Sequence, residues 1–277
     1  MGAAATGSAR ERIEPGQALV EVEALRACYG TLTVLEDIDL SIGAGEIHVI
    51  MGGSGSGKST LLRHLLGLNR PSAGRVKLFG QDIARLGERA LLGLRKRIGV
   101  SFQGGALFSS MTVEDNVAFP LREHTRLDEK TIRIMSRMKL EVVNLAGFED
   151  LLPSQLSGGM VKRAALARAI VMDPQLLFFD EPSAGLDPVV SAELDELILR
   201  LRDIMQITIV VVTHELQSAF KIADRITVLD RGHILMTDTT AAVRGSDHSR
   251  VQALLQRRPE ALQLDTEDYL RRLTGRG

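Results

Sequence analysis

The chain has 277 residues, of which 44% are hydrophobic, and its 34 basic and 35 acidic side chains give a net charge of −1. This length and apolar content suit one large α/β domain or a domain with a smaller lobe, and the balanced charge gives no overall electrostatic case for binding nucleic acid. The single cysteine, Cys28, excludes an internal disulfide and fits a reducing compartment. We expect it to be a small buried hydrophobic residue rather than a nucleophile.

The first residues are small, polar and interrupted by glycine and proline, which predicts a disordered leader over residues 1–17. This segment lacks the apolar stretch of a secretion signal, and no later segment reaches the roughly 20 apolar residues of a membrane span. Work at a membrane would therefore need a partner protein.

Two segments then alternate apolar and polar residues with a period of two, LVEVEALRA from Leu19 and TVLEDIDLSI from Thr33. This pattern is typical of antiparallel strands with one solvated face. RVKLFG, from Arg75, is a further strand candidate after a turn signal at 71–74. Tyr29 stands between these strands, where it could stack on a nucleotide base or simply contribute to packing.

The segment GGSGSGKST at 52–60 lies between the apolar run EIHVIM and the helical pattern LLRHLLGL. This motif predicts phosphate binding when it forms a loop between a strand and a helix. Glycine has no Cβ atom, so the backbone can curl with its N–H groups pointing at an anion. We expect Lys58 to reach the β- and γ-phosphates and the Ser59 hydroxyl to bind Mg²⁺. The candidate nucleotide-binding residues of this loop are Gly52, Gly53, Ser54, Gly55, Ser56, Gly57, Lys58, Ser59 and Thr60.

RIGVSFQ is expected to be a core strand that places Gln103 at its carboxyl tip, the edge where parallel sheets bind ligands. Gln103 could contact metal, water or phosphate, or be a surface amide. The following residues lack strand signals and show helical periodicity, which predicts an inserted helical lobe at about 104–171. We expect one helical face of this lobe to pack inward, formed by Ile134, Met135, Met138, Val142 and Leu145.

A second glycine-rich helix start follows in LSGGM, ahead of the helix-forming VKRAALARAIV. Ser157, Gly158 and Gly159 could bind an anion there, or the serine could only cap the helix. Two such ends in one chain suggest that the second serves a neighbouring molecule.

QLLFFDE is expected to be a buried strand with Asp180 and Glu181 at its carboxyl tip, beside the metal site. One carboxylate would bind the cation, usually through water, and the next would orient and deprotonate an attacking water. Asp187 follows in SAGLDP, and the apolar strand ITIVVVTHE ends at His214, which can donate a hydrogen bond to phosphate.

These motifs, in this order, resemble the nucleotide-binding subunits of ABC transporters over residues 18–240. The resemblance implies an α/β fold, a P-loop NTPase core of ABC type with an antiparallel β subdomain and an inserted helical subdomain, followed by a C-terminal extension at 241–277. It also implies ATP and Mg²⁺ as cofactors. Two copies would pair head to tail, each ATP lying between the glycine loop of one and the LSGGM of the other.

The resemblance implies a role for each matching residue. Tyr29 would stack on the adenine, Ser157, Gly158 and Gly159 would contact the opposite γ-phosphate, and Asp187 would make contact across the dimer. The metal would be bound by Ser59, Gln103 and Asp180. Catalysis would involve Lys58 and Gln103, with Glu181 as the base and His214 as the γ-phosphate sensor. The chain departs from the common pattern at Met160, where many members have Gln, so the resemblance implies no contact of a Gln amide at this position.

The chain is also similar to the MlaF-type ATPases of phospholipid ABC systems that work with MCE-domain proteins. The similarity lies in Met160, in the segment FQGGALFSSMTVEDNVAFPLREH from Phe102, and in DEPSAGLDPV. The similarity implies two ATPases under two MlaE-like multi-span permease subunits at the cytoplasmic face of the inner membrane of a Gram-negative envelope. Partners would include an MCE-domain protein and a small regulatory subunit. Another cargo, such as an amino acid, ion or drug, is the alternative.

The last segment, DTEDYLRRL, reads as a short helix with acids first and arginines last. It is either solvated or docks on the second ATPase or a regulatory partner through Tyr269, Leu270 and Leu273. Non-transport ABC proteins fit less well. Translation-factor types would carry two cassettes, and DNA-repair types a long insertion before LSGGM.

Overall fold

The structure is a computed structural model that describes residues 16–256. Its central sheet has the order β10-β9-β3-β8-β7-β6. The strands are β3 (Ile47–Met51), β6 (Ile98–Ser101), β7 (Leu176–Asp180), β8 (Thr208–Thr213), β9 (Arg225–Asp230) and β10 (His233–Thr239). All are parallel except the edge strand β10. Every residue of β3 and β8 is buried, as their mainly apolar sequences predict for strands covered on both faces.

The period-two segments form the second sheet, which confirms the predicted antiparallel pairing. Its order is β2-β1-β4-β5, with β1 (Ala18–Tyr29), β2 (Leu32–Gly43), β4 (Ala73–Leu78) and β5 (Gln81–Asp82). One face is buried and the other solvated. Cys28 lies in β1 and is half-buried rather than buried as expected, because this sheet keeps one face in water.

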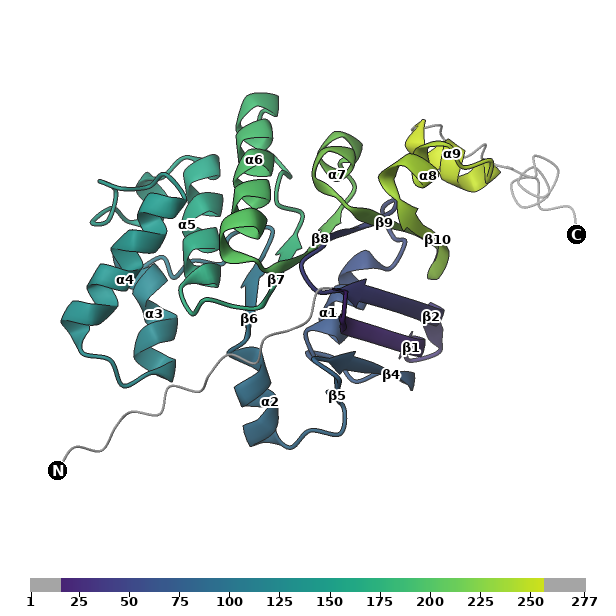
Figure 1. The fold of residues 1–277 in the computed structure, drawn as a ribbon, viewed down its shortest axis with the longest axis horizontal. Coiled ribbons are helices and arrows are strands. Elements are labelled where there is room, and N and C mark those ends of the chain that lie inside the picture. The colour runs from purple at the N-terminus through teal and green to yellow at the C-terminus, as the bar shows by residue number, and fades with distance from the viewer. Residues whose placement is uncertain (1–15, 257–277) are drawn as a thin grey trace, which may run out of the picture.

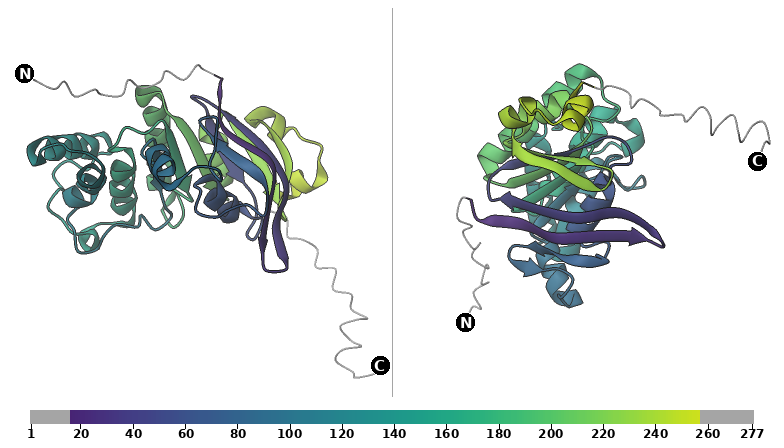
Figure 2. Two further views of the ribbon diagram at one scale, coloured as in Figure 1. Left: turned by 90° about the horizontal axis from the view of Figure 1, so that it is seen from below. Right: turned by 90° about the vertical axis from the view of Figure 1, so that its right-hand side faces the viewer.

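The helical lobe lies at one end of the molecule, away from the antiparallel sheet (Figures 1 and 2). It contains α3 (Val113–His124), α4 (Glu129–Val142), the 3₁₀ turn Pro153–Gln155 and α5 (Gly158–Ile170). The predicted inner face is confirmed for Met135 and Leu145, which pack in the main core. It is wrong for Ile134 and Met138, which are 52% and 59% exposed, and for Val142, which is also exposed. Helix α4 buries Ile132, Ser136 and Leu140 instead. The small Ser136 allows close packing there, and its hydroxyl is satisfied by the Ile132 carbonyl at 2.9 Å.

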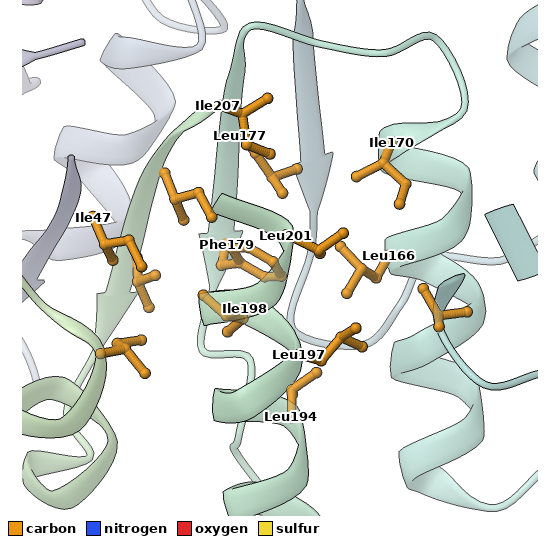
Figure 3. Close-up of a cluster of buried hydrophobic side chains, with 14 of the residues drawn as sticks. Ile47, Leu166, Ile170, Leu177, Phe179, Leu194, Leu197, Ile198, Leu201 and Ile207 are labelled. Carbon is orange, nitrogen blue, oxygen red and sulfur yellow. The ribbon is translucent and has the colours of Figure 1, made fainter. Parts of the chain in front are cut away.

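The remaining helices are α1 (Lys58–Leu65), α2 (Glu88–Arg95), α6 (Pro188–Met205), α7 (Leu216–Ile222), α8 (Thr240–Arg244) and α9 (Ser249–Leu255). In the main core, Phe179 of β7 belongs to one buried cluster with apolar residues of α5 and α6, among them Leu166 and Leu201 (Figure 3). Val243 of α8 and Val251 of α9 are fully buried in the same hydrophobic cluster, so packing continues past residue 240.

Residues 1–15 of the predicted leader at 1–17 lie outside the described residues, as does the predicted helix around Tyr269. Among the helices described within 16–256, none combines the length and the apolar character that a membrane crossing requires.

Candidate functional site

The glycine loop joins the buried strand β3 to helix α1, and its backbone tolerates no side chain at two points. A Cβ atom on Gly52 would lie 2.1 Å from the Leu229 carbonyl oxygen. Gly57 has a φ of 105°, and a Cβ there would lie 2.6 Å from Leu35 Cδ2. Only glycine fits these positions, since one lacks space and the other also requires the left-handed region.

Lys58 folds its ammonium over this loop. Its Nζ donates to the carbonyl oxygens of Gly52 at 2.8 Å and Gly53 at 3.0 Å. Burial lowers the pKa of Lys58, and the carboxylates of Glu181 and Asp180 act against that shift. The loop also holds the Ser56 hydroxyl, which is buried without a hydrogen-bond partner in the described part of the chain. Such an arrangement can exchange its carbonyl contacts for those of an anion.

A cavity of about 800 Å³ opens over the loop. The predicted site residues that line it are Gly52, Gly53, Ser54, Gly55, Lys58, Ser59, Gln103, Glu181 and His214. They come from separate segments of the chain, and the parallel sheet brings them to one edge as the sequence predicts. The volume is within the range of small-molecule sites.

The two carboxylates at the tip of β7 have different surroundings. Burial, followed by the charge of Glu181, raises the pKa of Asp180, while Lys58 and Arg63 lower it. The Glu181 carboxylate is fixed by the end of β8: Oε2 accepts from Thr213 Oγ1 at 3.1 Å and from the His214 N–H at 3.3 Å. The second oxygen, Oε1, lies 2.9 Å from His214 Nδ1. A carboxylate and an imidazole therefore act as one unit at the cavity wall.

Other predicted residues do not line this cavity. Ser157 caps α5 by accepting from the Met160 N–H at 3.3 Å, and Asp187 caps α6 by accepting from Val189 and Val190. A Cβ on Gly158 would lie 3.9 Å from Leu186, so the start of α5 adjoins the turn that leads to Asp187. The chain thus presents a second, separate surface of candidate residues.

Tyr29 and Met160 also stand apart from the cavity. Tyr29 is 48% exposed, and its hydroxyl accepts a hydrogen bond from Asn69 Nδ2 at 2.8 Å. Met160 is partly buried against the main core, so at this position the chain has a packing side chain where an amide is common.

Sequence reasoning missed the part of α9 that reaches the cavity, where Ala253 and Leu254 line the wall. Leu254 Cδ2 would lie 3.8 Å from a Cβ on Gly53, and Arg250 of the same helix pairs with Asp230 at 2.7 Å. The apolar spacing of Val251, Leu254 and Leu255 could have predicted an amphipathic helix. Nothing local in the sequence could have shown which surface it covers.

A glycine loop between a buried strand and a helix, with two carboxylates at the tip of another strand of the same parallel sheet, defines a P-loop nucleotide hydrolase. The chain belongs to the ABC transporter family, whose profile matches residues 35–184. It is therefore an ATP-binding ATPase, as the sequence predicted.

Curated relatives agree with this assignment. The chain is 41% identical over 260 residues to the intermembrane phospholipid transport system ATP-binding protein MlaF of Haemophilus influenzae, covering 93% of this chain and 98% of that protein. It is 43% identical over 239 residues to the probable ribonucleotide transport ATP-binding protein mkl of Mycobacterium leprae, covering 86% of this chain and 69% of that protein.

Solved structures show the same fold. The ABC transporter component cbiO1 of Clostridium perfringens superposes with a TM-score of 0.77 at 29% identity, covering 93% of this chain and 99% of that one. A dimeric ATP-binding cassette, MJ0796 with ADP and Pi, gives a TM-score of 0.73 at 30% identity, covering 80% of this chain and 98% of that one.

Proposed function

We propose that this chain powers phospholipid transport across a Gram-negative envelope, as a head-to-tail dimer under a multi-span permease. The proposal rests on the MlaF relative of Haemophilus influenzae, which the chain matches over almost the full length of both proteins. An MCE-domain protein and a small regulatory subunit would complete the assembly. The chain would sit at the cytoplasmic face of the inner membrane through its permease.

Within each subunit, the loop from Gly52 to Thr60 would hold the phosphates, and Lys58 would exchange its two carbonyl contacts for β- and γ-phosphate oxygens. Tyr29 would stack on the adenine. The hydrogen bond from Asn69 supports a fixed orientation for its ring.

The donor set fits a Mg²⁺ ion. Ser59 offers a hydroxyl at the cavity, Gln103 an amide oxygen, and Asp180 a carboxylate whose pKa is raised by burial and by the charge of Glu181. Between residues 16 and 256 no three His, Cys, Asp or Glu side chains gather to hold a metal alone. Water and phosphate would complete the coordination, as is usual for this ion, which when bound neutralises charge on the phosphates.

Glu181 would take the proton of the attacking water, and His214 would contact the γ-phosphate. The hydrogen bonds from Thr213 and the His214 N–H leave the Glu181 carboxylate oriented before substrate arrives. Preorganisation of this kind lowers the cost of reaching the transition state.

The split between the two candidate surfaces supports the dimer. Ser157, Gly158 and Gly159 present N–H groups at a helix start that does not line the chain's own cavity. In a head-to-tail pair that start would meet the partner's γ-phosphate, with Asp187 beside it. The solved MJ0796 cassettes are dimeric.

Gly158→Asp tests this arrangement. The glycine is exposed and its nearest neighbour leaves room for a side chain, so the subunit should fold and bind ATP. A carboxylate facing the partner's γ-phosphate should abolish ATP-dependent dimers and reduce hydrolysis at least about 100-fold, because like charges repel strongly at short range. Size-exclusion chromatography with light scattering measures the dimer.

Gly93→Asp is the matched control, since Gly93 is exposed on α2 and a Cβ there meets no atom within 4 Å. It should dimerise like the unchanged chain. Full ATP-dependent dimers in Gly158→Asp would contradict the head-to-tail pairing.

The cargo is tested by copurifying the chain with a co-expressed MlaE-like permease and identifying bound molecules by mass spectrometry. Phospholipid enriched over a permease-only preparation supports the proposal. A ribonucleotide other than the adenine nucleotides of the ATPase site would instead favour the kind of cargo for which the mkl relative is named. Sedimentation with membranes only when the permease is present tests the location.

A further inference from the structure

The turn that follows β7 has an uncommon backbone. Glu181 has a φ of 48°, in the left-handed region that residues with a side chain rarely adopt. Pro182 and Ser183 are buried, and the Ala184 N–H donates back to the Glu181 carbonyl at 3.2 Å. A residue keeps such a conformation only when its surroundings fix it.

Lys162 of α5 supplies that fixation. Its Nζ donates to the carbonyl oxygens of Pro182 and Ala184, both at 2.6 Å, and lies 3.4 Å from the carbonyl oxygen of Glu181. An ammonium has three donors, and here all three face one turn. Burial lowers the pKa of Lys162, and the nearby Glu181 carboxylate acts against that shift.

We infer that Lys162 is a positioning residue for Glu181. Lys162 is not among the residues that line the cavity, and its Nζ lies 3.4 Å from the Glu181 carbonyl oxygen, so it acts by holding the turn that aims the carboxylate. Without the ammonium, the Pro182 and Ala184 carbonyls would lose their charged donor, and the turn could relax out of the left-handed conformation.

The position of Lys162 extends this inference, which rests on the proposed head-to-tail dimer. Lys162 lies five residues after Ser157, on the same helix whose start would meet the partner's nucleotide. A shift of α5 on contact with that nucleotide would move Lys162 and with it Glu181. Lys162 therefore links the nucleotide in one site to the base that serves the other.

The first test is Lys162→Met in the full-length chain, which keeps the apolar stem and removes the donors. We expect kcat to fall about 10- to 100-fold, the range in which a misplaced catalytic group reduces rate. The ATP KM should stay within about twofold, because the phosphate loop is untouched, and the cooperativity of hydrolysis with ATP concentration should fall. Loss of nucleotide binding, or an unchanged kcat, would overturn the inference.

Lys139→Met is the matched control. Lys139 is similarly covered, and its Nζ pairs with Asp173 Oδ1 at 2.5 Å, beyond the other end of α5. It should lose a comparable amount of thermal stability while kcat and cooperativity stay unchanged. An equal fall of kcat in both variants would mean that Lys162 only stabilises the lobe.

A chemical rescue separates positioning from misfolding. Lys162→Cys, in a Cys28→Ser background, should be as slow as Lys162→Met, and alkylation with 2-bromoethylamine should restore most of the lost kcat by rebuilding an ammonium of nearly equal length. Failure of a fully alkylated protein to recover would contradict the inference.

The Glu181→Gln background tests the route of action. If Lys162 works through Glu181, adding Lys162→Met to Glu181→Gln should lower residual hydrolysis by less than about twofold. A full additional loss would place Lys162 on another path. Failure of the proposed dimer would appear differently, as Glu181→Gln chains that bind ATP and stay monomeric whatever residue occupies position 162.

Discussion

Glu181→Gln should retain ATP and accumulate closed dimers while hydrolysis falls at least about 100-fold, a typical loss for a general base. The glutamine amide oxygen can still accept from Thr213 Oγ1 and the His214 N–H, so the side chain should keep its place. It cannot take a proton from water, and the dimer closed by ATP would then have no route to opening. Steady-state hydrolysis, nucleotide retention on a desalting column and light scattering measure the three effects.

Glu196→Gln is the control, since Glu196 is 61% exposed and pairs with Lys221 away from the cavity. It should behave like the unchanged chain in all three measurements. Near-normal hydrolysis by Glu181→Gln would remove Glu181 from the role of base and leave His214 as the group to examine next.

The sequence was most informative where function needs a local pattern. The glycine loop, the apolar run of β3 and the acids after β7 each combine a strand with a tip residue, so one stretch of chain predicts both the element and its chemistry. The period of two in β1 and β2 likewise predicted an antiparallel pair, because alternation reports directly on one buried face.

The local sequence pattern did not predict which residues are buried where tertiary contacts determine it. Helix α4 has apolar residues on two faces, and only the neighbours α3 and α5 determine that Ile132 and Leu140 pack inward while Met138 faces solvent. Leu254 and Lys162 form no motif of their own. Their roles come from a helix folding back on the phosphate loop and from three carbonyls converging on one ammonium.

Lys58→Ala should act on ATP binding, the step before hydrolysis. It should reduce ATP affinity by about tenfold or more, because that ratio corresponds to the free energy of a hydrogen bond to a charged group. In the free chain the Lys58 ammonium satisfies the Gly52 and Gly53 carbonyls, so nucleotide must displace those contacts. Because burial lowers the pKa of Lys58, the substitution also removes a cation that is costly to bury, and the unliganded fold should lose little stability. The effect should therefore appear in binding, measured by fluorescent-nucleotide titration.

Lys58→Met separates the charge from the packing, because it keeps the apolar stem over the loop. It should bind ATP as weakly as Lys58→Ala and should lose the increase in melting temperature that saturating ATP gives the unchanged chain. Both Lys58 variants should stay monomeric under conditions where Glu181→Gln forms dimers, since closure needs bound nucleotide. ATP affinity in Lys58→Met equal to that of the unchanged chain would mean that the backbone N–H groups of the glycine loop hold the polyphosphate alone, and the lysine would then act only on the transferred phosphate.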